Sequence, residues 1–87
     1  MAERGPKVTI IGAGSLIFGR QAIWQMVHSP HLNTGTLALV DTDRSRLDRM
    51  ARLARMVAAE TGVALSVEAS VDRRDVLPGS DFVVLSF

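Results

Sequence analysis

The residues best suited to chemistry are two glycines in the segment Gly12-Ala13-Gly14-Ser15. An apolar, β-branched run over residues 7–12 leads into this segment, and apolar residues at helical spacing follow it. In such a strand–turn–helix setting, Gly12 permits a tight turn and Gly14 lets the backbone approach a pyrophosphate, while amides from Ser15 onward donate hydrogen bonds. We therefore predict a dinucleotide-binding turn. A glycine turn that only joins a strand to a helix is the alternative.

The third glycine of the usual dinucleotide-binding pattern is missing. Ile17 occupies its position, and Gly19 follows two residues later. Because the third glycine allows the helix to pack closely against the strand, its replacement predicts a slightly displaced helix rather than a loss of phosphate binding.

Asp41 is the second candidate ligand of a nucleotide. It ends another apolar segment, residues 36–41, about twenty positions after Gly19, where the pattern expects an acid that accepts hydrogen bonds from ribose hydroxyls. Since a carboxylate repels a 2′-phosphate, Asp41 favours NAD over NADP, although Arg44 nearby leaves NADP open. A simple loop cap is the other interpretation of Asp41.

The remaining polar residues include no candidate catalytic group. His28 and His31 flank a proline without a neighbouring cysteine or acid cluster, so no metal site is predicted there. A series of arginines alternates with acids at helical spacing, which is typical of a solvated helix face. Its members are Arg44, Arg46, Arg49, Arg52 and Arg55.

The composition is that of a soluble globular chain with one small domain. Hydrophobic residues make up 47% and charged residues 22% of the 87 residues, and the formal net charge is +1. This balance gives no drive towards nucleic acid or an anionic membrane. The sequence has no cysteine, and its start is not typical of a signal peptide, so we expect a cytoplasmic location.

Strands and helices in alternation would position the candidate residues, and the pattern of apolar residues predicts such an alternation. Strands that alternate with helices pair in parallel, because each crossover returns the chain to the same end of the sheet. We predict an α/β fold with a Rossmann-type open parallel sheet and flanking helices. The expected strands are 7–12, 36–41, 64–69 and 81–87; the expected helices are 15–28 and 43–61, with a short helix or turn at 72–77.

The second helix is the clearest of these elements. Asp43 is its expected N-cap, with Ser45 and Asp48 as a rival capping box, and Gly62 is placed to end it. Apolar side chains are expected in the core on one side of this helix and of the first. They are Trp24, which an oligomer interface could bury instead, Met26, Leu47, Met50, Ala54, Met56, Val57 and Ala58.

The predicted sheet stops after about the fourth strand, so we expect residues 1–87 to form a partial dinucleotide-binding domain. The catalytic and metal-binding parts would then lie outside this chain. An unpaired strand edge and uncovered apolar faces invite self-association, so a homo-oligomer or poor solubility is expected.

Several runs of the sequence together resemble glycoside hydrolase family 4, the NAD-dependent α-glucosidases, α-galactosidases and 6-phospho-glycosidases. The runs are residues 7–18, 39–43, 46–47 and 81–84. The resemblance implies that Asp41 holds the adenosine ribose and that Ser86 lines the nicotinamide side. It also assigns pyrophosphate binding to the turn and the amides after it, namely Gly12, Gly14, Ser15, Leu16, Ile17 and Phe18.

The resemblance further implies an unusual glycosidase mechanism, an exception to hydrolysis by two carboxylates. NAD oxidises the sugar at C3, a base removes the C2 proton, the aglycone is eliminated, and the steps then reverse. The family's divalent metal, commonly manganese, is held by a downstream Cys and His, and the base is a downstream tyrosine. Because these 87 residues include no Cys and no Tyr, the chain alone is not expected to cleave a glycoside.

Two other interpretations stay open from the sequence. One is a stand-alone, non-catalytic module that binds NAD or another nucleotide through the same turn. The other is the amino-terminal part of a dehydrogenase of the lactate and malate type, for which Phe18 after the glycine turn is less typical.

Overall fold

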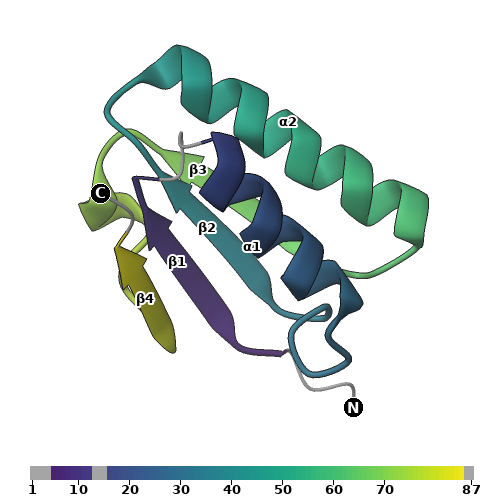
Figure 1. The fold of residues 1–87 in the computed structure, drawn as a ribbon. Coiled ribbons are helices and arrows are strands. Elements are labelled where there is room, and N and C mark those ends of the chain that lie inside the picture. The colour runs from purple at the N-terminus through teal and green to yellow at the C-terminus, as the bar shows by residue number, and fades with distance from the viewer. Residues whose placement is uncertain (1–4, 13–15, 86–87) are drawn as a thin grey trace.

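Four parallel strands form a sheet that carries two long helices on one face (Figure 1). The computed structural model describes residues 5–12 and 16–85 of the chain. Neighbouring strands are parallel, in the order β3-β2-β1-β4, which confirms the predicted Rossmann-type open sheet with flanking helices. The elements are β1 (Lys7–Ile11), α1 (Leu16–His28), β2 (Thr36–Val40), α2 (Arg44–Thr61), β3 (Ser66–Ser70), the 3-10 turn η1 (Arg73–Asp75) and β4 (Phe82–Leu85).

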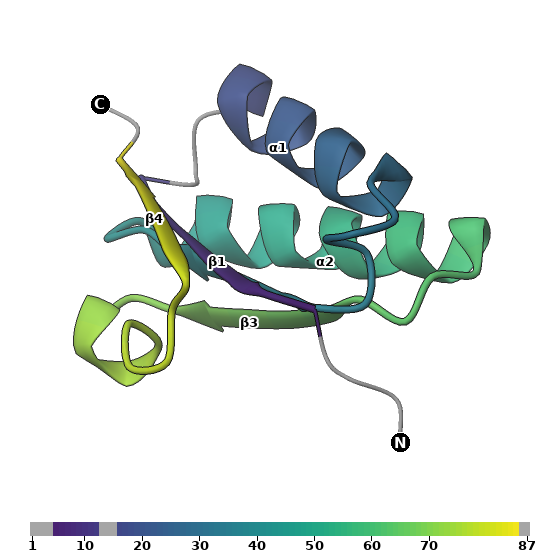
Figure 2. The same ribbon diagram turned by 90° about the horizontal axis from the view of Figure 1, so that it is seen from below.

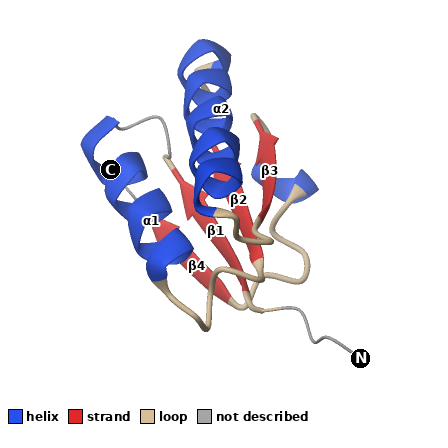
Figure 3. Cartoon of the chain, turned by 90° about the vertical axis from the view of Figure 1, so that its right-hand side faces the viewer, coloured by secondary structure: helices blue, strands red, loops and turns tan. Residues whose placement is uncertain are grey.

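The two faces of the sheet are covered very differently. Figure 2 shows α1 and α2 side by side on one face and the short η1 turn on the other, and Figure 3 shows the same layers from the side. In β2, Leu37 and Leu39 pack with the helices, whereas Ala38 and Val40 form a second cluster with Val76. The apolar run of β2 is therefore buried on both faces, as expected of a central parallel strand.

β4 lies on the far side of β1 from β2 because the segment before it is tied to the start of β1. The Asp81 amide donates to the Lys7 carbonyl at 2.8 Å, and the Lys7 amide donates to Asp81 Oδ2 at 2.8 Å. The hydroxyls of Thr9 and Ser80 are also hydrogen-bonded. The strand order consequently reverses at β1, and in open parallel sheets ligands bind beyond the carboxyl ends of the strands at such a reversal.

The α2 helix is capped at both ends. Asp43 accepts a hydrogen bond from the Arg46 amide at 3.1 Å, which confirms it as the N-cap. The rival capping box of Ser45 with Asp48 is wrong, because the helix already begins at Arg44. Gly62 ends the helix with φ of 73°, a left-handed conformation that glycine adopts without strain.

One side of α2 is buried and the other carries the arginines. The arginine series is exposed, which confirms the predicted solvated face. Val57 is partly buried against the core. The fully buried residues of the helix are Leu47, Met50, Ala51, Ala54 and Ala58.

The prediction that Trp24 and Met56 lie in the core is wrong: Trp24 is 62% exposed and Met56 is 50% exposed. On α1 the inward positions are occupied by Ile23, Met26 and Val27, so Trp24 falls outside the buried stripe of the helix. Met56 lies on the outer side of α2 in the same way. Met26 and Met50 are buried as predicted.

Several predicted boundaries shift by one or two residues. β3 begins at Ser66 rather than residue 64, because its parallel register with β2 starts at the pair Thr36 and Ser66. The expected short helix at 72–77 contracts to η1, and the last strand begins at Phe82 rather than residue 81; its expected end at 86–87 lies outside the described residues. Within the part of the chain that the structure describes, no helix combines the length and apolar character needed to cross a membrane.

Candidate functional site

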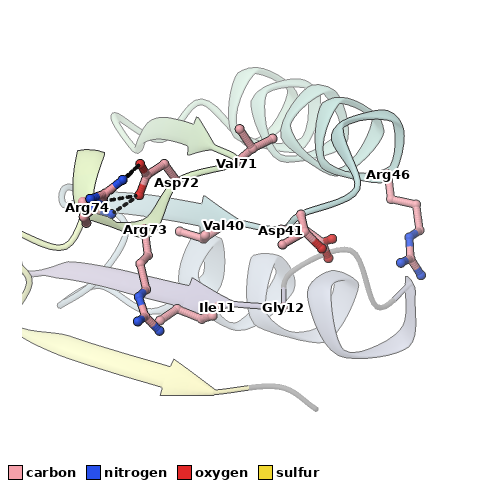
Figure 4. A pocket seen from close by; sticks show the side chains of 10 residues that line it. Ile11, Gly12, Val40, Asp41, Arg46, Val71, Asp72, Arg73 and Arg74 are labelled. Atoms are coloured by element: carbon pink, nitrogen blue, oxygen red, sulfur yellow. Dashed lines mark hydrogen bonds and ion pairs between the residues drawn. The ribbon is translucent and has the colours of Figure 1, made fainter.

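The carboxyl ends of β1 and β2 form a pocket together with the segment that follows β3 (Figure 4). Its volume is about 690 Å³. It opens at the carboxyl ends of the strands, the edge at which an open parallel sheet is expected to bind ligands. The described residues that line it are Ile11, Gly12, Val40, Asp41, Thr42, Arg46, Val71, Asp72, Arg73 and Arg74.

Gly12 makes the turn out of β1 at the floor of this pocket. Its φ is 88°, which only glycine adopts without strain, and its amide donates to the Val40 carbonyl at 2.8 Å. The end of β1 is thereby held against the end of β2. The chain leaves the sheet next to Asp41, with backbone rather than side chain facing the pocket at this position.

Asp41 directly follows β2 and lines the same pocket, half-buried. Its Oδ1 accepts a hydrogen bond from the Asp43 amide at 2.8 Å, so the carboxylate closes a tight local turn before α2. The loop-cap role weighed from the sequence therefore exists in the structure. It holds the carboxylate at the edge of the pocket.

Arg46 lines the pocket, whereas the sequence had singled out Arg44. Arg44 is exposed and lies outside the described lining, because two positions on a helix differ by about 200° around its axis. The Nε of Arg46 lies 3.2 Å from Asp43 Oδ2. The hydrogen bond from the Arg46 amide is the main cause that lowers the pKa of Asp43 below its ordinary 3.8.

The segment after β3 adds charged residues that sequence reasoning did not assign to the site. Arg74 holds Asp72 in a two-pronged contact, with Nε 3.1 Å from Oδ1 and Nη2 2.9 Å from Oδ2. This side-chain contact lowers the pKa of Asp72 and raises that of Arg74. Arg73, from the same turn, extends towards Ile11 (Figure 4). The only sequence signal was the charged run at 72–75 directly after a predicted strand.

Of the predicted cofactor ligands, the structure brings Gly12 and Asp41 into one pocket. Leu16, Ile17 and Phe18 form the first turn of α1, as far as the backbone is described. Gly14, Ser15 and Ser86 lie outside the described residues. Among the residues that are described, no three metal-binding side chains come together.

The sheet order, the one-sided pair of helices and the pocket at the carboxyl ends of the strands define a Rossmann-type α/β protein. Two lactate dehydrogenases have the same fold over all of this chain. The enzyme from Cryptosporidium parvum, solved with lactic acid and β-nicotinamide adenine dinucleotide, matches with a TM-score of 0.78 at 24% identity. The enzyme from Eimeria maxima, solved with NADH and oxamate, matches with a TM-score of 0.76 at 17% identity.

At these identities the likeness concerns the fold alone. The chain spans about a quarter of the length of either dehydrogenase, 25% and 24%. A more specific relationship comes from the sequence: the model of family 4 glycosyl hydrolases matches residues 7–87. The chain belongs to this family.

Proposed function

We propose that this chain is the NAD-binding part of a family 4 glycosidase. The observation that carries the proposal is the meeting of Gly12 and Asp41 in one pocket at the carboxyl ends of two adjacent parallel strands. Membership of the family supplies the class of enzyme. The dehydrogenases of the same fold contain a nicotinamide dinucleotide, in line with this cofactor.

The described residues fit a dinucleotide in three respects. The pocket is roomy enough for part of a ligand, at about 690 Å³. The positive φ of Gly12 turns the backbone without a side chain in the way. Asp41 lines the same pocket, and a carboxylate after the second strand is the group that accepts hydrogen bonds from a ribose diol in such folds. The proposed pyrophosphate ligands are Gly12, Gly14, Ser15, Leu16, Ile17 and Phe18.

In this arrangement the start of α1 presents backbone amides and partial positive charge to the pyrophosphate. Asp41 is proposed to orient the adenosine ribose, and Ser86, which is outside the described residues, is proposed from the family resemblance to line the nicotinamide side. The dinucleotide, when bound, supplies the hydride acceptor for transient oxidation of a sugar. The divalent metal of the family, proposed to be manganese, does not fit the described residues, since no suitable ligand cluster occurs among them. We propose that its ligands and the catalytic base are not among the residues of this chain.

Calorimetric titration of the chain with NAD tests the proposal. Saturable binding is expected, and Asp41→Ala should weaken it about tenfold, because hydrogen bonds to a charged group are worth about 1.5–3 kcal/mol. Asp41→Asn separates the two roles of this residue. It keeps an oxygen for the Asp43 amide but removes the charge that favours the ribose contact, so it should fold normally and still bind more weakly.

Asp48→Ala is the matched control, since Asp48 is an exposed acid of α2 outside the described pocket lining. It should bind NAD as the unchanged chain does. The proposal fails if the folded chain shows no heat of binding with NAD, or if the Asp41 and Asp48 variants bind equally well.

A further inference from the structure

The pocket beside Asp41 contains more positive than negative charge. Three arginines and two aspartates are found among its described lining residues. Arg74 is engaged by Asp72 through two nitrogens, so its charge is largely balanced by the residue that precedes η1. Arg46 stands at the other end of the pocket, on the side of Asp41 (Figure 4).

Arg46 is connected to Asp41 through Asp43. The Asp43 amide donates to Asp41 Oδ1 at 2.8 Å, and the Asp43 carboxylate in turn accepts from the Arg46 amide at 3.1 Å and contacts Arg46 Nε at 3.2 Å. The N-cap residue Asp43 thus contacts the guanidinium at Nε, the nitrogen nearest the backbone. The terminal nitrogens of Arg46 extend beside the pocket (Figure 4), and the side chain remains 54% exposed.

We propose that Arg46 binds the 2′-phosphate of NADP, so that the pocket accepts NADP as well as NAD. This inference rests on the proposed function, since it requires the adenosine ribose to lie at Asp41. A guanidinium offers a phosphate two parallel hydrogen bonds, and an arginine near the acid is the usual means by which such folds admit the 2′-phosphate. Arg46 is paired with Asp43 through Nε, and the rest of its guanidinium would bring positive charge to the phosphate, which offsets part of the repulsion from the Asp41 carboxylate in the same pocket.

The test is a titration of NAD and NADP, at low salt, into the unchanged chain, Arg46→Gln and Arg44→Gln. The unchanged chain should bind NADP within about tenfold of NAD. Arg46→Gln should weaken NADP about tenfold or more and leave NAD within about twofold, because it removes a charge-assisted contact made only by the 2′-phosphate. Arg44→Gln removes the same charge from the same helical turn, outside the described lining, and should alter neither affinity.

A second probe isolates the phosphate itself. Adenosine 2′,5′-bisphosphate should bind more tightly than adenosine 5′-monophosphate to the unchanged chain, and Arg46→Gln should abolish the difference. Folding of the variant is expected to survive, since the capping bond uses the Arg46 backbone amide, and circular dichroism checks it.

The outcomes separate the two proposals. Binding of NAD without NADP overturns the role of Arg46 and leaves the proposed function standing. Equal losses of NADP affinity in Arg44→Gln and Arg46→Gln would mean that the general positive charge of the helix attracts the phosphate. This result would also overturn the role of Arg46. Failure of the folded chain to bind either dinucleotide overturns both.

Discussion

Glycine is required at position 12 for two reasons, its backbone conformation and its place in the pocket, and a comparison with Gly79 separates them. The Gly12 φ of 88° makes any side chain strained, and its position in the pocket makes any side chain an obstacle to a ligand. Gly79 has φ of 81°, with open space around a Cβ atom and no part in the described pocket lining. Gly79 therefore shares with Gly12 only the need for a positive φ.

Gly12→Ala and Gly79→Ala are each expected to lower the free energy of unfolding by about 1–2 kcal/mol, the cost of a left-handed conformation for a residue with a side chain. Only Gly12→Ala should also lose affinity for NAD. Urea denaturation measures the first effect and calorimetric titration the second. Equal NAD affinity in the two variants would show that the Gly12 backbone does not approach the cofactor.

Asp41 shows why a structural role and a ligand role need not compete. The oxygen that accepts from the Asp43 amide fixes the carboxylate, and a fixed carboxylate loses less rotational freedom when a ribose binds. A local cap at the edge of a pocket is thus a form of preorganisation.

Among the elements, α2 matters most to the site, because its first turn carries both Asp43 and Arg46. The hydrogen bond from the Arg46 amide, the largest cause, lowers the pKa of Asp43 in the folded chain below 3.8. A group whose folded pKa is lowered stabilises the fold at pH values above its unfolded pKa. This stabilisation disappears as the pH falls through the folded value.

Asp43→Asn retains an oxygen for the cap but cannot titrate. It is therefore expected to be less stable than the unchanged chain at pH 7 and to show a smaller loss of stability below about pH 4. Urea midpoints measured at pH 7 and pH 3 test this, with Asp48→Asn as an exposed acid of the same helix that does not cap it. If the unchanged chain and Asp43→Asn lose the same stability between pH 7 and pH 3, the assignment of this pH dependence to Asp43 is contradicted.

Considered as one body, the described chain has a covered side and an open side. α1 and α2 shield one face, whereas three large apolar residues of the edge strand β4, Phe82, Val83 and Leu85, are 58%, 49% and 59% exposed. An exposed apolar edge strand is a template for pairing with another chain. We therefore propose that this chain forms homo-oligomers.

Self-association through β4 should make the apparent mass in light scattering rise with concentration. Val83→Lys is expected to shift it towards the monomer, because a charge on an edge strand opposes pairing. Met56→Lys, which also replaces an exposed apolar residue but lies on α2, is the control. A sharp monomer peak from the unchanged chain at high concentration would refute the proposal.

The strand–helix alternation, the parallel pairing and the convergence of Gly12 with Asp41 could all be predicted from the sequence. Apolar runs and their periods reflect burial, which is a property of each segment. The carboxyl ends of adjacent parallel strands necessarily meet at one edge, so the residues that follow them become neighbours. The N-cap at Asp43 was likewise readable, because capping depends on residues only three positions apart.

The sequence could not predict which side of each helix or strand faces which layer of the fold; this is seen only in the tertiary structure. Whether Arg44 or Arg46 reaches the pocket depends on the rotation of α2 about its axis, which packing against the sheet sets. Arg73 and Arg74 reach the site only because the chain passes under the sheet at η1. Trp24 is exposed because the described chain places no layer outside α1. Local patterns determine the elements, but their mutual packing, which no local pattern encodes, decides which side chains meet.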